Sequence, residues 1–244
     1  MAGTYNEHRP DYPAAALQWC VAPLRREING LRVLDLGAGT GKLTALLAKL
    51  GADVTAVDPD ESMMAVLRSQ MPSVHALHGP AEEIPLPDGS VDAVLCGQSL
   101  HWFDLPRALP EIARVLTSGG VLAAMWNSDD DRVPWVAGLR DASEGVGAAP
   151  LSARRAEAAG TRIDEFGQLF LPAECAEFKN SFLRTADSLV VTMSTHSQLL
   201  VMPPAERDRL LGQVRAYLAS QPETAEGEFE LPIVTTIVRA VLRG

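Results

Sequence analysis

Cysteine is scarce in this 244-residue chain, which has three copies: Cys20, Cys96 and Cys175. Their odd number and wide spacing, with no CxxC pair and no Cys/His cluster, argue against a disulfide framework and against a zinc site. Reduced, buried thiols are typical of cytoplasmic proteins. We therefore expect a cytoplasmic protein that holds no metal.

Long apolar runs and excess positive charge are also missing. No stretch approaches the roughly 20 apolar residues that a membrane-spanning helix needs, and the opening MAGTYNEHRPDYP lacks the apolar centre of a signal peptide. The formal net charge of -10 opposes binding to phosphate backbones. We expect no membrane span, no nucleic-acid partner and a small-molecule ligand, with the chain acting as a monomer or homodimer.

What the sequence does contain is a regular alternation of strands and helices in its first half. Continuous apolar runs that end at glycine or aspartate predict parallel strands, and Leu at helical spacing predicts helices between them. This order predicts an α/β fold with helices on both faces of a parallel sheet. The expected strands are 31–36, 52–58, 73–79, 90–98 and 121–126, and the expected helices are 41–51, 59–71 and 105–116.

The pattern changes after position 127. Residues 129–160 are rich in Ala, Gly and charge, which predicts loosely packed helices or a mobile cover. Further on, 173–185 alternates like a strand, 203–220 is an amphipathic helix, and 229–242 is a final strand. We expect a single domain, 1–244, composed of an N-terminal lid segment (1–30), a ligand-binding core (31–127), a helical cover insertion (128–172) and C-terminal strands and helices (173–244).

The stretch VLDLGAGTGKLT, residues 33–44, places three glycines in a turn directly after the first predicted strand. In an open α/β sheet this turn contacts the ligand, and glycine lets the ligand approach the backbone. A P-loop is excluded, because GxxxxGK[ST] would need glycine at Leu36 and a hydroxyl at Leu43. The dinucleotide pattern GxGxxG would need glycine at Lys42, which argues weakly against a nicotinamide-dependent oxidoreductase.

Two carboxylates flank this turn. Asp35 precedes it, where a carboxylate repels a pyrophosphate but attracts an ammonium group. Asp58 ends the second predicted strand, about 20 residues further on, where a carboxylate can accept both ribose hydroxyls. A cationic amino acid joined to a nucleoside, such as S-adenosyl-L-methionine (SAM), satisfies both. Asp58 is equally suited to cap the helix that begins at Pro59, in a capping box with Glu61, and the two roles are compatible.

With these residues in place, the chain resembles the class I SAM-dependent methyltransferases, in particular the small-molecule branch related to ubiquinone-biosynthesis and trans-aconitate methyltransferases. The resemblance covers essentially the whole chain. It rests on the ordered motifs VLDLGAGTGKLT, VTAVDPDESMMAVL, GPAEEIPLPDGSVDAVLCGQSLHWFD and EIARVLTSGGVLAAMWN. It implies a Rossmann-like class I methyltransferase fold with a seven-stranded, mostly parallel sheet and an antiparallel last strand.

The resemblance also implies which residues contact SAM. Asp35 is expected to hold its ammonium group and Asp58 its ribose hydroxyls. Pro80 departs from the family pattern, since many relatives carry an acidic residue there, and Glu82 is expected to compensate. The other implied contacts are Gly37, Ala38 and Gly39 along the methionine and ribose, Met63 against the adenine, Ala81 and Glu82 at the adenine edge, Gln98 and Ser99 under the methionine, and Arg9 and Tyr12 at its carboxylate.

The segment GQSLHWFD, after the fourth predicted strand, lies at the mouth of the expected crevice. His101 is the candidate general base, because histidine titrates in the useful range, or alternatively a residue that orients the ligand. Trp102 and Trp126 are candidates for an aromatic wall around the acceptor, or alternatively core residues. His196 is a further candidate at the acceptor site.

We expect methyl transfer from SAM to a small-molecule acceptor at a hydroxyl or carboxylate oxygen, by in-line displacement in a closed pocket, leaving S-adenosyl-L-homocysteine. Carbon or nitrogen methylation, and SAM binding without transfer, stay open as alternatives. Arg140, Arg154 and Arg155 of the predicted cover are candidates to hold an acidic acceptor or to form a solvated face. The sequence does not identify the acceptor.

Overall fold

The computed structural model describes residues 11–143, 152–194 and 197–244. The strands are β1 (Arg32–Leu36), β2 (Asp53–Asp58), β3 (His75–His78), β4 (Val91–Gly97), β5 (Leu116–Asp129), β6 (Glu174–Thr185) and β7 (Glu228–Val241). The helices are α2 (Ala14–Val21), α3 (Lys42–Lys49), α4 (Glu61–Gln70), α5 (Leu105–Val115), α6 (Pro134–Ala142), α7 (Ser152–Asp164), α8 (Ala186–Ser194), α9 (Ser197–Leu200) and α10 (Pro204–Ser220), with 3-10 helices η1 (Ala22–Leu24) and η2 (Leu100–Trp102).

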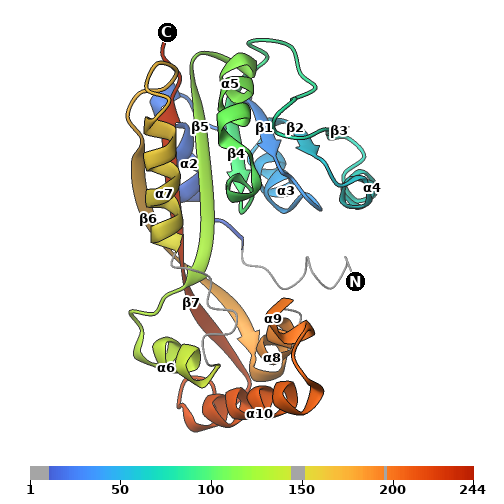
Figure 1. The fold of residues 1–244 in the computed structure, drawn as a ribbon, viewed down its shortest axis with the longest axis vertical. Coiled ribbons are helices and arrows are strands. Elements are labelled where there is room, and N and C mark those ends of the chain that lie inside the picture. The colour runs from blue at the N-terminus through green and yellow to red at the C-terminus, as the bar shows by residue number, and fades with distance from the viewer. Residues whose placement is uncertain (1–10, 144–151, 195–196) are drawn as a thin grey trace.

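The described strands form one seven-stranded sheet in the order β3-β2-β1-β4-β5-β7-β6. Strands β1 to β5 are parallel, and β7 runs antiparallel to both β5 and β6 (Figure 1). The predicted α/β class, the mostly parallel sheet and the antiparallel last strand are therefore confirmed. The strand order reverses at β1, where β1 lies between β2 and β4, and the carboxyl ends of the parallel strands meet at one edge.

Alternate residues of each central strand supply two apolar layers. Leu34 and Leu122 pack with α5 and α7 on one face of the sheet. Val33 and Ala123 pack with α2 and α3 on the other face. This alternation follows from the two-residue repeat of a strand, and it explains why the central strands are apolar at nearly every position.

Helix α2 belongs to this core, although its residues fall within the predicted N-terminal lid segment. Ala16, Leu17, Cys20 and Val21 are fully buried against the sheet. The described part of the segment is thus a structural helix. Residues 1–10 lie outside the described residues.

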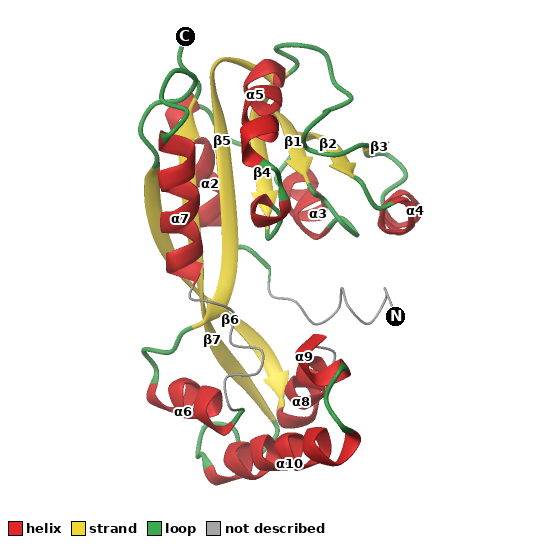
Figure 2. Cartoon of the chain, viewed as in Figure 1, coloured by secondary structure: helices red, strands yellow, loops and turns green. Residues whose placement is uncertain are grey.

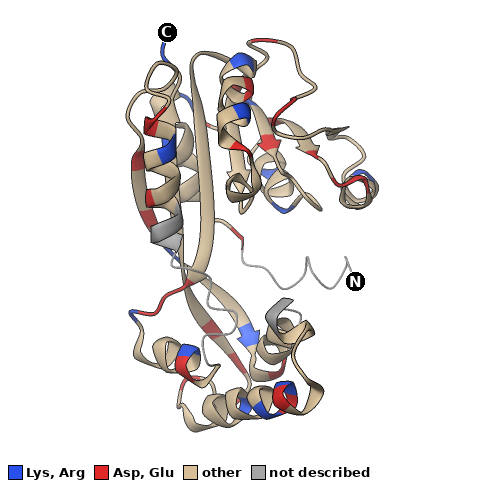
Figure 3. Cartoon of the chain, in the orientation of Figure 1, with Lys and Arg blue, Asp and Glu red and all other residues tan. Residues whose placement is uncertain are grey.

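A separate cluster of helices stands beyond the carboxyl ends of the parallel strands (Figure 2). We call α6, α8, α9 and α10 the helical lobe. Its apolar interior includes Trp135 of α6, Leu189 of α8 and Leu218 of α10, together with Phe229 and Leu231 of β7. Helix α10 contains both basic and acidic residues (Figure 3). None of the helices that the structure describes combines the length and apolar character needed to cross a membrane.

The helical lobe differs from the predicted cover insertion, 128–172. Helix α6 of that segment does pack in the lobe, but α7 packs on the sheet through Ala156, Ala159 and Ile163. The other helices of the lobe come from the connection between β6 and β7. The boundary is also shifted, because β5 continues to Asp129 and already begins at Leu116, where the sequence predicted the end of a helix.

Candidate functional site

The glycine turn after β1 is held by hydrogen bonds to β2. The N–H groups of Gly37 and Ala38 donate to one carbonyl of β2 at 2.8 and 3.1 Å. Gly37 and Gly39 have φ of 73° and 58°, the left-handed region that favours glycine. A Cβ on Gly37 would lie 2.4 Å from Ser99 Cβ, so protein packing requires this glycine. Among the described atoms, a Cβ on Gly39 would meet Met63 Sδ alone, at 3.6 Å, which leaves its backbone approachable by a ligand.

Asp35 is buried at the end of β1 with half of its carboxylate unpaired. Its Oδ2 accepts a hydrogen bond of 2.6 Å from the Thr44 hydroxyl. Its Oδ1 is buried and has no hydrogen-bond partner within the described residues. Burial raises the pKa of Asp35 to about 7, the Thr44 hydrogen bond lowers it, and the negative charge of Asp58 raises it further. A cation donor placed at Oδ1 would satisfy this atom and stabilise the carboxylate.

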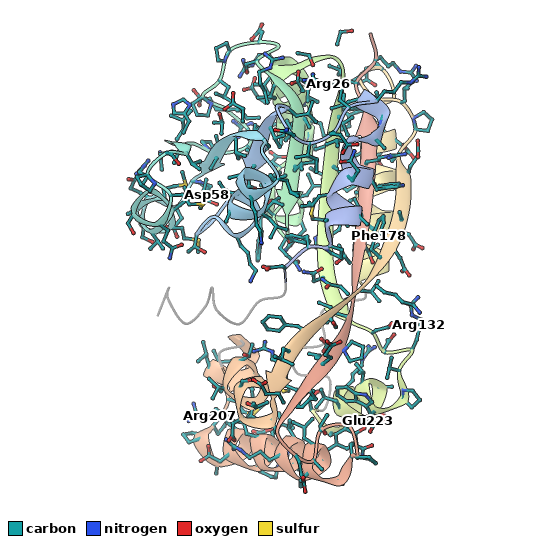
Figure 4. All side chains as sticks on the ribbon, turned by 180° about the vertical axis from the view of Figure 1, so that it is seen from behind. Arg26, Asp58, Arg132, Phe178, Arg207 and Glu223 are labelled. Atoms are coloured by element: carbon teal, nitrogen blue, oxygen red, sulfur yellow. The ribbon has the colours of Figure 1, made fainter. Side chains whose placement is uncertain are left out.

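Asp58 ends β2 and faces the glycine turn. Its Oδ2 accepts from the Gly39 N–H and its Oδ1 from the Asp60 N–H, both at 2.8 Å. A carboxylate has about four acceptor positions, so each oxygen keeps capacity for a hydroxyl donor. Figure 4 marks Asp58 at the edge of the core that is turned toward the helical lobe.

The N-terminus of α4 is capped by Asp60. Its side chain accepts from the N–H groups of Ser62 and Met63 at 2.8 and 3.3 Å. The prediction that Asp58 caps this helix in a capping box with Glu61 is therefore wrong. The result leaves Asp58 available for a ligand and places Met63, half-buried, beside the glycine turn.

The loop after β3 is fixed to helix α5. Ala81 is buried, and the neighbouring Pro80 is exposed. The Glu82 carboxylate accepts a hydrogen bond of 2.7 Å from the backbone N–H of Asp104, the residue that precedes α5. Glu82 thus ties the loop to α5, and its predicted contact with the adenine edge stays a prediction.

Helix α5 also holds this loop through Arg114, whose two ion pairs sequence reasoning missed; one of them is with Asp88 of the loop at 2.8 Å. Arg114 donates to the carbonyls of Ile84 and Leu86 at 2.9 and 2.8 Å and pairs with Glu111 at 2.7 Å. Glu111 in turn accepts from the Ile84 N–H at 3.0 Å. The hydrogen bonds to the carboxylates of Glu111 and Asp88 raise the pKa of Arg114 above its ordinary value. The sequence spacing indicates that Glu111 and Arg114 can pair on one face of a helix, but it does not indicate that Arg114 binds the backbone of the loop.

The turn after β4 brings three strands together. Ser99 Oγ donates to the Leu36 carbonyl of β1 at 2.6 Å. Gln98 donates from its backbone N–H to Met125 of β5 at 2.9 Å and from its side chain to the Asn127 carbonyl at 3.2 Å. Gln98 has φ of 60°, a conformation that costs energy in a residue with a Cβ. This strained residue lies where the predicted ligand passes.

His101 and Trp126 are joined across this turn. The Trp126 indole Nε1 donates to His101 Nδ1 at 3.2 Å. Trp126 is fully buried in the main core, whereas Trp102 is 80% exposed and lies 4.9 Å, centroid to centroid, from the His101 ring. The predicted contact of Trp102 with an acceptor stays a prediction. Trp126 is a core residue, as the alternative reading expected, and the prediction that it forms a wall around the acceptor is wrong. Because its side chain is buried, it can influence a ligand only through His101.

The chain enters the site through Asp11 and Tyr12. The Asp11 carboxylate pairs with Lys42 at 3.2 Å, and its carbonyl accepts from Asn127 at 3.4 Å and Asn180 at 2.6 Å. Tyr12 is buried, and a Cβ on Gly97 would lie 3.0 Å from its hydroxyl. Sequence reasoning missed this anchor because its asparagines are 116 and 169 positions away.

Two predicted residues, Arg9 and His196, lie outside the described residues. In the predicted cover, Arg140 is exposed and pairs with Asp131 at 3.1 Å, which fits the solvated face, and its contact with an acidic acceptor stays a prediction. Within the described ranges, no three His, Cys, Asp or Glu side chains gather in a group that could hold a metal ion.

Comparison with known proteins adds a family to this geometry. The methyltransferase domain family matches residues 34–124. An uncharacterized methyltransferase of Mycobacterium tuberculosis is 41% identical over 241 residues, which cover 98% of this chain and 93% of the relative. A malonyl-[acyl-carrier protein] O-methyltransferase of Pectobacterium atrosepticum is 41% identical over 96 residues, 39% of this chain and 38% of that protein.

A solved structure from Anaeromyxobacter dehalogenans, assigned as a type II methyltransferase, superposes with a TM-score of 0.66 at 27% identity. It covers 95% of this chain and 97% of its own. The superposition therefore includes the helical lobe as well as the sheet.

Proposed function

This chain belongs to the methyltransferase family, and we propose that it transfers the methyl group of SAM to an oxygen atom of a small-molecule acceptor. The single observation that carries SAM binding is the unpaired, buried Oδ1 of Asp35, just before the turn in which the backbone of Gly39 is approachable. That pair suits an ammonium group on a ligand that lies against the turn. SAM, when bound, supplies a methyl group already activated on a sulfonium.

The residues at the carboxyl ends of the strands fit this ligand. Asp35 would hold its ammonium group, and Asp58 keeps acceptor positions for the ribose hydroxyls. Met63 lies beside Gly39, where it would offer an adenine ring an apolar contact. The hydrogen bonds of Ser99 and Gln98 fix the turn against which the methionine part would lie. The role of the protein is to position donor and acceptor and to exclude water.

Oxygen is the proposed methyl acceptor because one relative, which matches 39% of this chain, is named as an O-methyltransferase. Both a hydroxyl and a carboxylate oxygen suit in-line displacement. Because two of the three cysteines are buried thiols and all three are free, we place the reaction in the cytoplasm.

The test uses the purified protein, methyl-labelled SAM and fractionated small molecules from the source cell. Isothermal titration of SAM is run on the same preparation, and mass spectrometry follows the label into products. Label on an oxygen atom supports the proposal. Label on carbon or nitrogen moves the reaction to those alternatives, and tight SAM binding without any label indicates a SAM-binding protein that transfers nothing. Failure to bind SAM overturns the proposal.

A further inference from the structure

Thr44, the last residue of the motif VLDLGAGTGKLT, has no role in the proposed function so far. It is the third residue of α3 and is fully buried, and its Oγ1 donates to Asp35 Oδ2 at 2.6 Å. Its backbone N–H also lowers the pKa of Asp35. The first turn of α3 has no side-chain cap of its own, so the carboxylate from β1 serves donors that the helix leaves unpaired. Thr44 therefore holds one oxygen of Asp35 from the side of α3.

The other oxygen of Asp35 is where a proton fits best. Oδ1 is buried and has no hydrogen-bond partner within the described residues. Because Oδ2 faces the donors of Thr44, the proton of a neutral carboxyl group belongs on Oδ1. A buried carboxylate with one unsatisfied oxygen costs more free energy than the neutral acid, and burial raises the pKa of Asp35 to about 7. Below neutral pH the ligand-free protein thus carries a proton where the ammonium group is expected.

The groups around Asp35 favour this proton until a cation reaches Oδ1. Asp58, at the end of β2, adds a negative charge that raises the pKa of Asp35 further. Cys96 of β4 is a neutral thiol, since burial and the charge of Asp35 both raise its pKa. Lys42, the first residue of α3, pairs with the Asp11 carboxylate at 3.2 Å.

We propose that Thr44 is the positioning residue that presents Asp35 Oδ1 to the ligand, and that the ammonium group of SAM displaces a proton from this oxygen, which is released to water. The inference rests on the proposed function and adds a proton to its binding step. The O–H bond of the carboxyl group breaks, and its bonding pair stays on Oδ1. The ammonium group keeps its own protons and donates one of them in a hydrogen bond to the carboxylate.

The exchange is measured by isothermal titration of SAM at pH 6, in two buffers that differ in ionisation enthalpy. The difference in heat counts the protons released. We expect about one proton per SAM in the wild type, because pH 6 lies below the folded pKa of Asp35. Asp35→Asn should release none. Between pH 5 and 7 the affinity of the wild type for SAM should rise up to about ten-fold per pH unit.

The role of Thr44 is tested without any ligand. In protein labelled with ¹³C-aspartate, the carboxyl signal of Asp35 is assigned by its loss in Asp35→Asn and followed through pH. Thr44→Val should raise the midpoint by at least about one pH unit, since the carboxylate loses a donor, and lower SAM affinity at pH 7 at least about ten-fold. Thr44→Ser keeps the hydroxyl and should restore both.

Thr224→Val is the matched control for Thr44→Val. The buried Thr224 hydroxyl donates to the Leu218 carbonyl at 2.6 Å, beside α10 and away from Asp35. Its loss should cost similar stability and leave the midpoint and the proton count unchanged. An unshifted midpoint in a folded Thr44→Val protein, or a Thr44→Ser protein that titrates like Thr44→Val, overturns the positioning role.

The exchange and the proposed function fail in different ways. Asp35 that is already ionised at pH 6 in the free wild type, or SAM binding without proton release, overturns the exchange alone and leaves the proposed function standing. A protein that binds no SAM overturns the proposed function and the exchange with it, while the titration of Asp35 still decides the role of Thr44.

Discussion

At Asp35 two effects oppose each other until a ligand arrives. Burial in the core penalises the charged carboxylate, and the Thr44 hydroxyl satisfies only one of its oxygens. A buried carboxylate with an unsatisfied oxygen destabilises the folded protein, but it is suited to bind a cationic ligand. The same position would be more stable as a neutral side chain.

Replacing Asp35 by Asn removes this conflict and its pH dependence. The pKa of the carboxyl rises from 3.8 to about 7 on folding, so the folded state holds the proton more tightly. The free energy of unfolding is therefore highest below the unfolded pKa and falls as pH rises through the folded one. Between these two pKa values, denaturant unfolding should show that the free energy of unfolding declines by on the order of 2–4 kcal/mol less in Asp35→Asn than in the wild type. SAM affinity at alkaline pH should fall at least about ten-fold.

Asp53→Asn is the control for this substitution. Asp53 is exposed at the start of β2, and its replacement should leave both the slope and SAM affinity near the wild-type values. If the free energy of unfolding of Asp35→Asn changes with pH as it does in the wild type, burial does not control the titration of Asp35. If it keeps SAM affinity, the carboxylate does not meet the ammonium group.

Gly39→Ala tests the approachable backbone. Ala at φ of 58° costs about 1–2 kcal/mol from conformation alone, and its methyl group would stand where the ligand approaches. Gly89→Ala is the matched control, because Gly89 has φ of 59° and no described atom lies within 4 Å of its Cβ position. Both variants should lose similar stability in thermal unfolding, and Gly39→Ala alone should lose SAM binding in titration. Equal SAM affinity in the two variants would show that the ligand does not contact the turn.

Single residues were predicted from sequence where a motif fixes both type and place. Asp35 and the glycines are such cases, because their positions follow from the end of β1. The bond between His101 and Trp126 was not predictable, since it joins residues 25 positions apart through the packing of β4 against β5. The mistaken cap at Asp58 has a similar cause: Asp60 competes for the same helix end, and only the backbone path decides between them.

At the scale of elements, the strands of the core were predicted because buried parallel strands have an unmistakable apolar run. Helix α7 was not assigned to the sheet, because it packs through small side chains instead of a stripe of Leu. A Cβ on Gly160 would lie 3.5 Å from Val238 of β7, so the helix backbone approaches the sheet closely. Such close packing leaves little periodic signal in the sequence.

Helix α5 supports the loop that carries Ala81 and Glu82, and Arg114→Met should weaken that support. The substitution leaves the carbonyls of Ile84 and Leu86 without their charged donor. We expect a loss of about 2–3 kcal/mol in the free energy of unfolding and weaker SAM binding in titration. Arg215→Met is the control, because Arg215 makes one exposed ion pair at 3.7 Å and should cost under about 0.5 kcal/mol. Unchanged SAM affinity in Arg114→Met would show that the loop does not contribute to the site.

At the scale of the whole molecule, the core and the helical lobe have separate apolar interiors. Strands β6 and β7 continue past the last residue pair of β5, Asp129 with Ile233, to the pair of Thr185 with Glu228. Arg132 lies at this junction (Figure 4). It pairs with Asp130 at 2.6 Å and with Glu177 at 3.0 Å. The sequence does not reveal the lobe as a unit, because its interior is assembled from two stretches of the chain, 133–139 and 182–233, with α7 between them.

Separate interiors predict separate unfolding. Leu218 of α10 and Leu47 of α3 are both fully buried, one in the lobe and one in the core. Truncation to Ala should cost each about 3 kcal/mol. Because the lobe joins the core mainly through one two-stranded ribbon, Leu218→Ala should accelerate amide hydrogen exchange in α6, α8 and α10 and leave the sheet protected. SAM affinity should then stay within about two-fold of the wild type, while acceptor turnover falls.

Leu47→Ala should instead accelerate exchange in the sheet and weaken SAM binding. Exchange that rises throughout the chain in Leu218→Ala would mean that core and lobe unfold as one cooperative unit, and that the site for SAM depends on the lobe.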